Sequence, residues 1–153
     1  MPKPNQRDVA RDDVQVDRDR LIKPSLGTIT RAGFEGNVEV CVRYLAAWLD
    51  GNGCVPIHWL MEDAATAEIA RTQLWQWLHF ADDGREPLCL DDGTPVDYAL
   101  LERALISLPS RLNDRLRMPG ASRVNEAIGM LDRLTHAEEL VDFLTLPAYE
   151  RID

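Results

Sequence analysis

Two adjacent carboxylates, Glu62 and Asp63, stand just before an amphipathic segment in the stretch GCVPIHWLMEDAATAEIARTQLWQWL, residues 53–78. An acidic side chain in the first turn of a helix accepts backbone N–H groups and meets the positive end of the helix dipole, which is a structural role. A carboxylate with one oxygen left free and directed into a cleft is instead able to act as a general base. The pattern alone favours helix capping for Asp63, and the catalytic role remains the alternative.

Other reactive side chains lie nearby in the sequence without an evident partner. His58, Glu62 and Glu68 offer metal ligands. However, Pro56 argues against a helix that starts early enough to align His58 with Glu62, and no second ligand cluster has zinc-like spacing. We therefore expect no metal site within this chain. Cys54 is a candidate nucleophile with no identifiable base, so the role of a small buried hydrophobic residue is favoured.

The charge balance argues against nucleic acid and membrane partners. The 153 residues include 26 acidic and 17 basic side chains, for a formal charge of −9, and such a surface repels phosphate backbones and anionic lipids. It also argues against a DNA-binding helix-turn-helix over residues 123–144. The group Arg111, Arg115, Arg117 and Arg123 fits a solvated helix face better than a basic binding patch.

Three cysteines, Cys41, Cys54 and Cys89, stand at spacings that fit no disulfide framework, and the chain opens without a signal segment. No apolar run approaches the roughly 20 residues of a membrane-spanning helix. We therefore expect a reducing, cytoplasmic location.

A polar N-terminal segment precedes the folded part of the chain. Residues 1–25 alternate charges with little apolar material, so they bury too little surface to offset the entropy of ordering and are predicted to form an extended arm or linker. Residues 26–153 are predicted to form the folded domain. Its first helix begins at the N-cap Thr30 and ends at Gly51. The apolar stripe of this helix recurs at steps of three and four residues: Phe34, Val38, Cys41, Leu45 and Trp48.

The rest of the domain is predicted to be mainly helical. Further helices are expected over 63–79, 98–108, 110–117 and 123–134, and from Thr135 onward. Thr135 and Glu138 match a capping box, and Pro109 should end or kink the third helix. A turn-rich connection, DGNGCVPIHW, precedes the second helix, and two Asp-Gly pairs within 81–96 allow a short hairpin. The predicted fold class is therefore all-α: a helical bundle with one irregular loop or short hairpin.

The string GNGCVPIHWLMEDAATAEIARTQLWQW, residues 51–77, closely resembles the signature region of the A-type malate synthases. MPKPNQ at the start, GTITRAGFEGNVEVCVRYLAAWLDG before the signature and FLTLPAY near the end resemble the same family in the same order. The resemblance covers nearly the whole chain but only about the last quarter to third of such an enzyme. It implies a fold like the helical C-terminal plug domain of that family, preceded by an arm that resembles the end of the barrel region. The chain departs from the family over residues 105–125, where two prolines interrupt a segment that is usually one longer helix.

The resemblance implies an acyltransferase of the glyoxylate cycle, which condenses acetyl-CoA with glyoxylate and uses water to release malate and CoA. In that family the Asp of the MED motif takes a proton from the acetyl methyl group, and here that residue is Asp63. Met61, Glu62 and Cys54 are further candidates for contact with the substrate. The family uses magnesium, whose ligands lie on the catalytic barrel and outside this chain. We therefore expect the chain to be inactive without a barrel supplied in cis or in trans.

Two hypotheses remain for the function. In the first, the chain is the C-terminal domain of a malate synthase and supplies the catalytic base. In the alternative, it is a non-catalytic helical interaction module that retains the family fold, and Asp63 only caps a helix. We also expect an apolar face to be exposed in the absence of the barrel, including Met61, part of Trp59 and the first turn of the second helix, and we expect self-association at that face.

Overall fold

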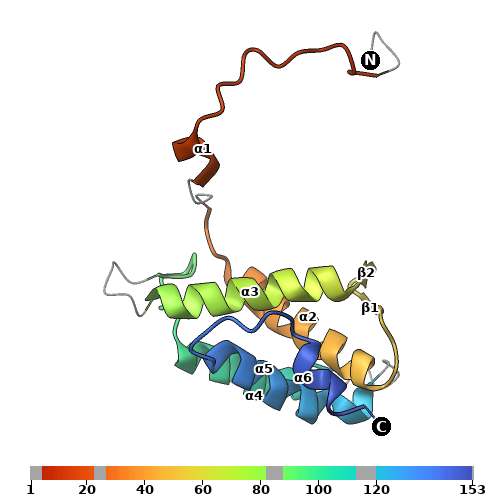
Figure 1. Cartoon of the computed structure of the whole chain (residues 1–153). Coiled ribbons are helices and arrows are strands. Elements are labelled where there is room, and N and C mark those ends of the chain that lie inside the picture. The colour runs from red at the N-terminus through yellow and green to blue at the C-terminus, as the bar shows by residue number, and fades with distance from the viewer. Residues whose placement is uncertain (1–4, 23–26, 82–87, 113–119, 153) are drawn as a thin grey trace.

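The structure, a computed structural model, describes residues 5–22, 27–81, 88–112 and 120–152. The longer helices of this described part form a bundle (Figure 1): α2 (Arg31–Leu49), α3 (Ala64–Ala81), α4 (Tyr98–Leu112) and α5 (Val124–His136). Its shorter elements are the helices α1 (Arg18–Ile22) and α6 (Leu146–Tyr149), the 3-10 helix η2 (Ala121–Arg123), and two antiparallel strands, β1 (Val55–Ile57) and β2 (Leu60–Glu62). The predicted helical fold class is confirmed, with the addition of this small sheet.

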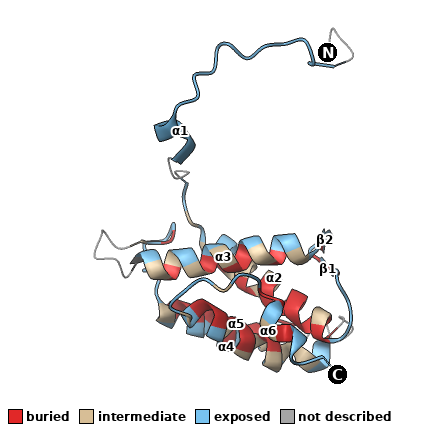
Figure 2. Cartoon of the chain, viewed as in Figure 1, coloured by how far each residue is buried: buried red, intermediate tan, exposed pale blue. Residues whose placement is uncertain are grey.

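The helix α2 lies at the centre of the bundle and contacts α3, α4 and α5. It begins as predicted, because the Thr30 hydroxyl accepts a hydrogen bond from the Gly33 backbone N–H at 3.0 Å. Every residue from Cys41 to Ala47 is buried, whichever way its side chain points, so protein surrounds this half of the helix (Figure 2). Gly51 follows the helix with φ at +84°, the left-handed conformation that glycine adopts readily at a helix end.

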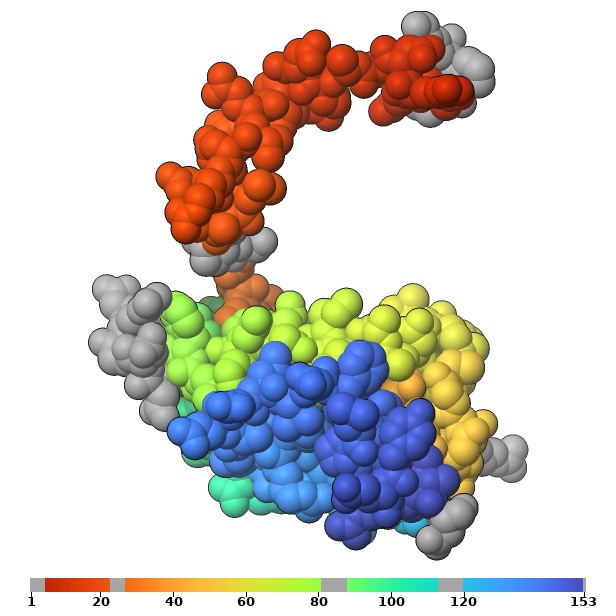
Figure 3. Space-filling model, viewed as in Figure 1, coloured from red at the N-terminus to blue at the C-terminus, as the bar shows by residue number. Residues whose placement is uncertain are grey.

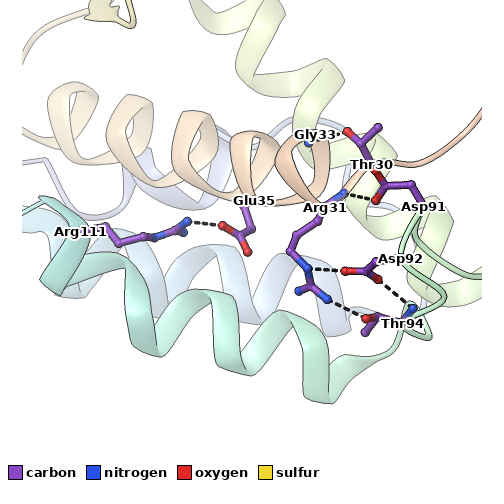
Figure 4. Close-up of polar contacts among 8 residues, drawn as sticks. All are labelled: Thr30, Arg31, Gly33, Glu35, Asp91, Asp92, Thr94 and Arg111. Atoms are coloured by element: carbon purple, nitrogen blue, oxygen red, sulfur yellow. Dashed lines mark hydrogen bonds and ion pairs between the residues drawn. The ribbon is translucent and has the colours of Figure 1, made fainter.

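A loop over residues 88–97 is fastened to the first turn of α2 (Figure 4). The Arg31 backbone N–H donates to Asp91 Oδ1 at 3.0 Å. The Arg31 guanidinium binds Asp92 Oδ2 at 2.7 Å and the Thr94 hydroxyl at 2.6 Å. The loop thereby connects the start of α2 to the start of α4.

Of the hairpin predicted within residues 81–96, the described residues 88–96 form one antiparallel bridge, between Cys89 and Pro95. The first Asp-Gly pair of that prediction lies outside the described residues. A regular hairpin, β1–β2, lies instead over residues 55–62, within the stretch that was expected to be an irregular connection.

The helix α4 continues through Pro109 to Leu112, so of the two predicted effects of Pro109 the end of the helix is wrong, and the kink stays a prediction. Proline inside a helix removes one backbone donor and its ring crowds the carbonyl one turn earlier, and burial of the Leu112 side chain favours the last turn despite this cost. An ion pair between Arg111 and Glu35 of α2 holds the same turn (Figure 4). The separate helix predicted over 110–117 therefore begins within α4, and its later residues lie outside the described part of the chain.

The capping box predicted at Thr135 and Glu138 starts no helix. Thr135 is instead a buried residue in the last turn of α5, where its hydroxyl donates to the carbonyl oxygens of Leu131 and Asp132 at 2.9 and 3.0 Å. A Thr hydroxyl that bonds back to its own helix is satisfied there and does not cap a following one.

An irregular segment over residues 137–145 follows α5 and lies against α3 (Figure 3). Arg71 of α3, buried and ion-paired with Glu68, donates to the Val141 carbonyl at 2.8 Å. The Glu68 carboxylate also accepts the Leu144 backbone N–H at 3.0 Å. These bonds attach the C-terminal segment to the helix that Asp63 precedes.

The N-terminal residues 5–22 are exposed throughout and lead away from the bundle (Figure 1). Within them Arg18–Ile22 form the short helix α1, which the prediction of an extended arm did not include.

The backbone at Gly120 lies close against α2. Gly120 has φ at +74°, and a Cβ built there would lie 2.1 Å from the Ala46 carbonyl oxygen. We expect Gly120→Ala to lower the free energy of unfolding by about 2–5 kcal/mol, because it adds left-handed backbone strain to an overpacked contact. Urea denaturation followed by circular dichroism measures the change. The matched control is Gly36→Ala in α2, where a Cβ meets open space and stability should rise by about 0.5–1 kcal/mol.

Candidate active site

The hairpin β1–β2 delivers Asp63 to the start of α3. Val55 and Ile57 of β1 are buried in the bundle core, and the strand register pairs Val55 with Glu62 and Ile57 with Leu60. Asp63 follows β2 directly. The hairpin on one side and α3 on the other therefore set the position of its carboxylate.

The turn of this hairpin has an uncommon backbone conformation. His58 and Trp59 both have positive φ, at 48° and 69°, which a two-residue type I′ turn requires. Left-handed conformations cost a non-glycine residue about 1–2 kcal/mol, so surrounding contacts must hold the turn. The turn positions hold His58 and Trp59 in place of the Asn-Gly or Asp-Gly pair that usually marks such a turn, and the alternation of Val55 and Ile57 is the remaining signal.

Asp63 is placed as the N-cap of α3. Its Oδ1 accepts a hydrogen bond from the Thr66 backbone N–H at 3.0 Å and another from the Thr66 hydroxyl at 3.3 Å. Both of these bonds use the same oxygen, and among the described residues none donates a hydrogen bond to Oδ2. The side chain is exposed. One oxygen thus caps the helix, and the other accepts no hydrogen bond from the described residues.

The capping bonds change the acidity of Asp63. The Thr66 backbone N–H holds the pKa of Asp63 below its usual value: desolvation opposes this effect, and the Thr66 hydroxyl and the backbone N–H groups of Ala65 and Asp63 add to it. Hydrogen bonds to the charged form stabilise that form, so the carboxylate is ionised at neutral pH. A lowered pKa also makes it a weaker base than a free aspartate.

The tip of the hairpin carries an apolar patch, which we call the hairpin patch: Trp59, Leu60 and Met61. Trp59 is fully exposed, and Leu60 and Met61 are 63% and 66% exposed. The expected exposure of Met61 and Trp59 is thus confirmed. Glu62, the next residue, is 8% exposed, so of the two adjacent acidic side chains Asp63 alone is accessible.

Cys54 lies immediately before β1 and is exposed, so the expectation of a small buried residue is wrong at this position.

Tyr44 of α2 is a buried residue that the sequence analysis did not single out, because no sequence signal distinguishes it from the apolar residues of that helix. Burial, followed by the negative charges of Asp63 and Cys54, raises the pKa of the Tyr44 hydroxyl.

The candidate metal ligands do not gather in the described part of the chain, where no group of three His, Cys, Asp or Glu side chains is arranged to hold an ion. His58 contacts Glu39 of α2 at 3.2 Å, and Glu68 pairs with Arg71. These residues do not fit the magnesium ion that the family resemblance implies, so no step is assigned to a metal held by them.

Comparison with known proteins bears on the same residues. The sequence model of the family described as "Malate synthase, C-terminal" matches residues 28–152. The chain belongs to the malate synthase family. Malate synthase A of Escherichia coli (strain K12) is 41% identical over 150 residues, which cover 95% of this chain and 27% of that protein. The bifunctional glyoxylate cycle protein of Caenorhabditis elegans is 42% identical over 154 residues, which cover 99% of this chain and 15% of that protein.

A third relative is named for a cellular compartment. The glyoxysomal malate synthase of Zea mays is 43% identical over 145 residues, which cover 90% of this chain and 24% of that protein. Within the described residues, no helix is both long and apolar enough to span a bilayer. The cytoplasmic location of this malate synthase domain stays a prediction. The chain spans between 15% and 27% of the length of these three relatives.

The capping geometry predicts how Asp63 titrates. Its folded-state pKa is lowered, so it should titrate below about 3.9, the value of an unfolded chain. A lowered folded pKa contributes stability that is present above about pH 3.9 and is lost as pH falls through the folded pKa. Carbon-13 NMR of the carboxyl group measures the titration. In Thr66→Ala, which keeps the backbone donor and loses the hydroxyl, the pKa should rise part of the way back. A wild-type value at or above the unfolded one would contradict this account.

Proposed function

We propose that this chain serves as the C-terminal domain of a malate synthase and that Asp63 is the base of its condensation reaction. The observation that carries the proposal is the position of Asp63 within the MED motif. It is exposed between an ordered hairpin and a long helix, with Oδ2 accepting no hydrogen bond from the described residues. A base fixed by rigid elements on both sides suits proton abstraction from a weakly acidic C–H group, because the reacting atoms must be held in line.

The proposed reaction consumes acetyl-CoA, glyoxylate and water and gives malate and CoA. Asp63 takes a proton from the acetyl methyl group, and the electron pair of the broken C–H bond forms the enolate. The enolate carbon then attacks the aldehyde carbon of glyoxylate, and the new alkoxide takes up a proton. Water finally cleaves the thioester and releases CoA. In the family, the arginine that stabilises the enolate and the acidic magnesium ligands belong to the barrel, so this chain contributes the proton acceptor.

Because the pKa of Asp63 is low in this chain, the barrel must supply an effect that raises it. The capping bonds and the helix dipole favour the charged form and weaken the base. Removing water from a carboxylate has the opposite effect and raises its pKa. We propose that the hairpin patch docks against the mouth of the barrel and that this contact desolvates Asp63. The barrel would then raise the pKa of Asp63, which strengthens the base, and would also complete the substrate site.

Reconstitution in trans tests the proposed role. The chain should show no turnover alone and should release CoA when it is mixed with the separately expressed barrel portion of the Escherichia coli relative. Asp63→Asn should lower the turnover of the mixture by at least about 100-fold. Asn caps helices about as well as Asp, so this change removes the base while it retains the cap. Thiol release followed with a chromogenic disulfide measures the rate.

The matched control for this experiment is Asp142→Asn, an exposed aspartate in the segment after α5, which should leave turnover unchanged. An active mixture that keeps its rate in Asp63→Asn would reject the catalytic role. It would then favour the non-catalytic interaction module, in which Asp63 is a cap only.

The hairpin patch should also drive self-association when the barrel is absent. Sedimentation velocity should show oligomers of the isolated chain, and a double change of Trp59→Ser and Met61→Ser should weaken their association at least about tenfold. Ile106→Ser is the control, because Ile106 on α4 is 70% exposed and lies outside the patch. A strictly monomeric wild-type chain that binds no apolar dye would contradict this prediction.

A further inference from the structure

Arg43 is a buried cation near the middle of α2. It is only 4% exposed, and a guanidinium removed from water needs close polar partners. Its Nη1 binds Glu39 Oε1 at 2.9 Å, one helical turn earlier, and its Nη2 donates to the Pro56 carbonyl oxygen at 2.9 Å. One side chain thus joins the central helix to the backbone of β1.

Glu39 makes the second connection between α2 and the hairpin. Its Oε1 accepts from Arg43, and its Oε2 lies 3.2 Å from His58 Nε2. Burial by itself would raise the pKa of Glu39, but the hydrogen bonds from Arg43 and His58 outweigh burial and hold the pKa below its usual value. Glu39 is therefore charged at neutral pH and bridges a buried cation to the first residue of the turn.

The hairpin needs these contacts because its tip has little other support. The turn residues His58 and Trp59 are left-handed, a conformation that persists only where its surroundings enforce it. Beyond Ile57 the side chains of the hairpin patch are exposed. The core side chains of β1 and the bond from Arg43 to Pro56 hold the first strand, and the contact from Glu39 to His58 reaches the turn that directs the second strand toward Asp63.

We infer that Glu39 and Arg43 form a clamp that sets the position of the hairpin and, through it, of the Asp63 carboxylate. This inference rests on the proposed role of Asp63 as the base. Both residues are positioning residues, since they act through the hairpin. Their substitution should misplace the base without removing a contact to acetyl-CoA or glyoxylate.

The kinetic test uses the full chain together with the barrel portion. Arg43→Met keeps an unbranched apolar stem and removes every donor. We expect kcat to fall by about 10- to 100-fold, as for small misplacements of a catalytic group, with little change in KM. Arg43→Lys restores one cationic donor group and should recover part of the lost kcat. An unchanged kcat in Arg43→Met would overturn the inference.

A structural test on the chain alone separates the clamp from the proposed function. In Arg43→Met, hydrogen exchange at the amides of β1 and β2 should be at least about tenfold faster, while the amides of α5 keep their protection. If the wild-type mixture shows no turnover, the proposed function fails, and hydrogen exchange still decides whether the clamp holds the hairpin. Unchanged exchange in the hairpin would overturn the clamp in either case.

Two further variants guard against a general loss of folding. Arg71→Met removes an equally buried arginine that also joins a carboxylate of its own helix to a distant backbone carbonyl. It should lower stability while keeping kcat and the slow exchange of the hairpin. If Arg43→Met does not fold, Glu39→Gln keeps the shape of the clamp and removes its charge. The same fall in kcat and faster hairpin exchange are expected there, and wild-type values for both would overturn the inference.

Discussion

The burial of α2 is the constraint on which the rest of this domain depends. From Cys41 to Ala47 every residue of the helix is buried. Each neighbouring element is therefore positioned by its packing against α2. The backbone at Gly120 packs against Ala46, α3 lies along the helix, and Arg43 reaches out of it to β1. The position of the hairpin therefore depends on α2, to which hydrogen bonds connect it.

The same geometry gives Asp63 two opposed properties. The hydrogen bonds from Thr66 fix the carboxylate and lower its pKa, and both effects follow from its place at the N-terminus of α3. Fixing a base favours catalysis, while lowering its pKa weakens proton abstraction. This domain spans about a quarter of the Escherichia coli relative. The rest of such an enzyme is therefore available to raise the pKa of Asp63 again. In the proposed enzyme, desolvation by the partner domain provides the compensating shift, so that the base reaches its strength only when the active site is closed.

The elements predicted correctly are those with long periodic patterns. The stripe from Phe34 to Leu45 and the N-cap Thr30 define α2 because each is a local property of the chain. The errors have local causes as well. Pro109 and the Thr135–Glu138 pair carry signals for a helix boundary, but the buried Leu112 and the bonds of Thr135 to its own helix outweigh them. The residues His58 and Trp59 carry no sequence signal for a turn. In the proposed clamp, contacts from α2 hold this turn.

The sequence by itself determined the family, the helical class and the identity of the candidate base, because the MED motif and the helix signals are written in neighbouring residues. Only the tertiary structure decided which oxygen of Asp63 caps the helix, that Glu62 is buried while Cys54 is exposed, and that Arg43 and Glu39 hold the hairpin. The cap and the Arg43–Glu39 pair join residues one helical turn apart, whereas the bonds from α2 to the hairpin join separate elements. Burial and hydrogen-bond geometry, which spacing in the sequence does not encode, set these properties.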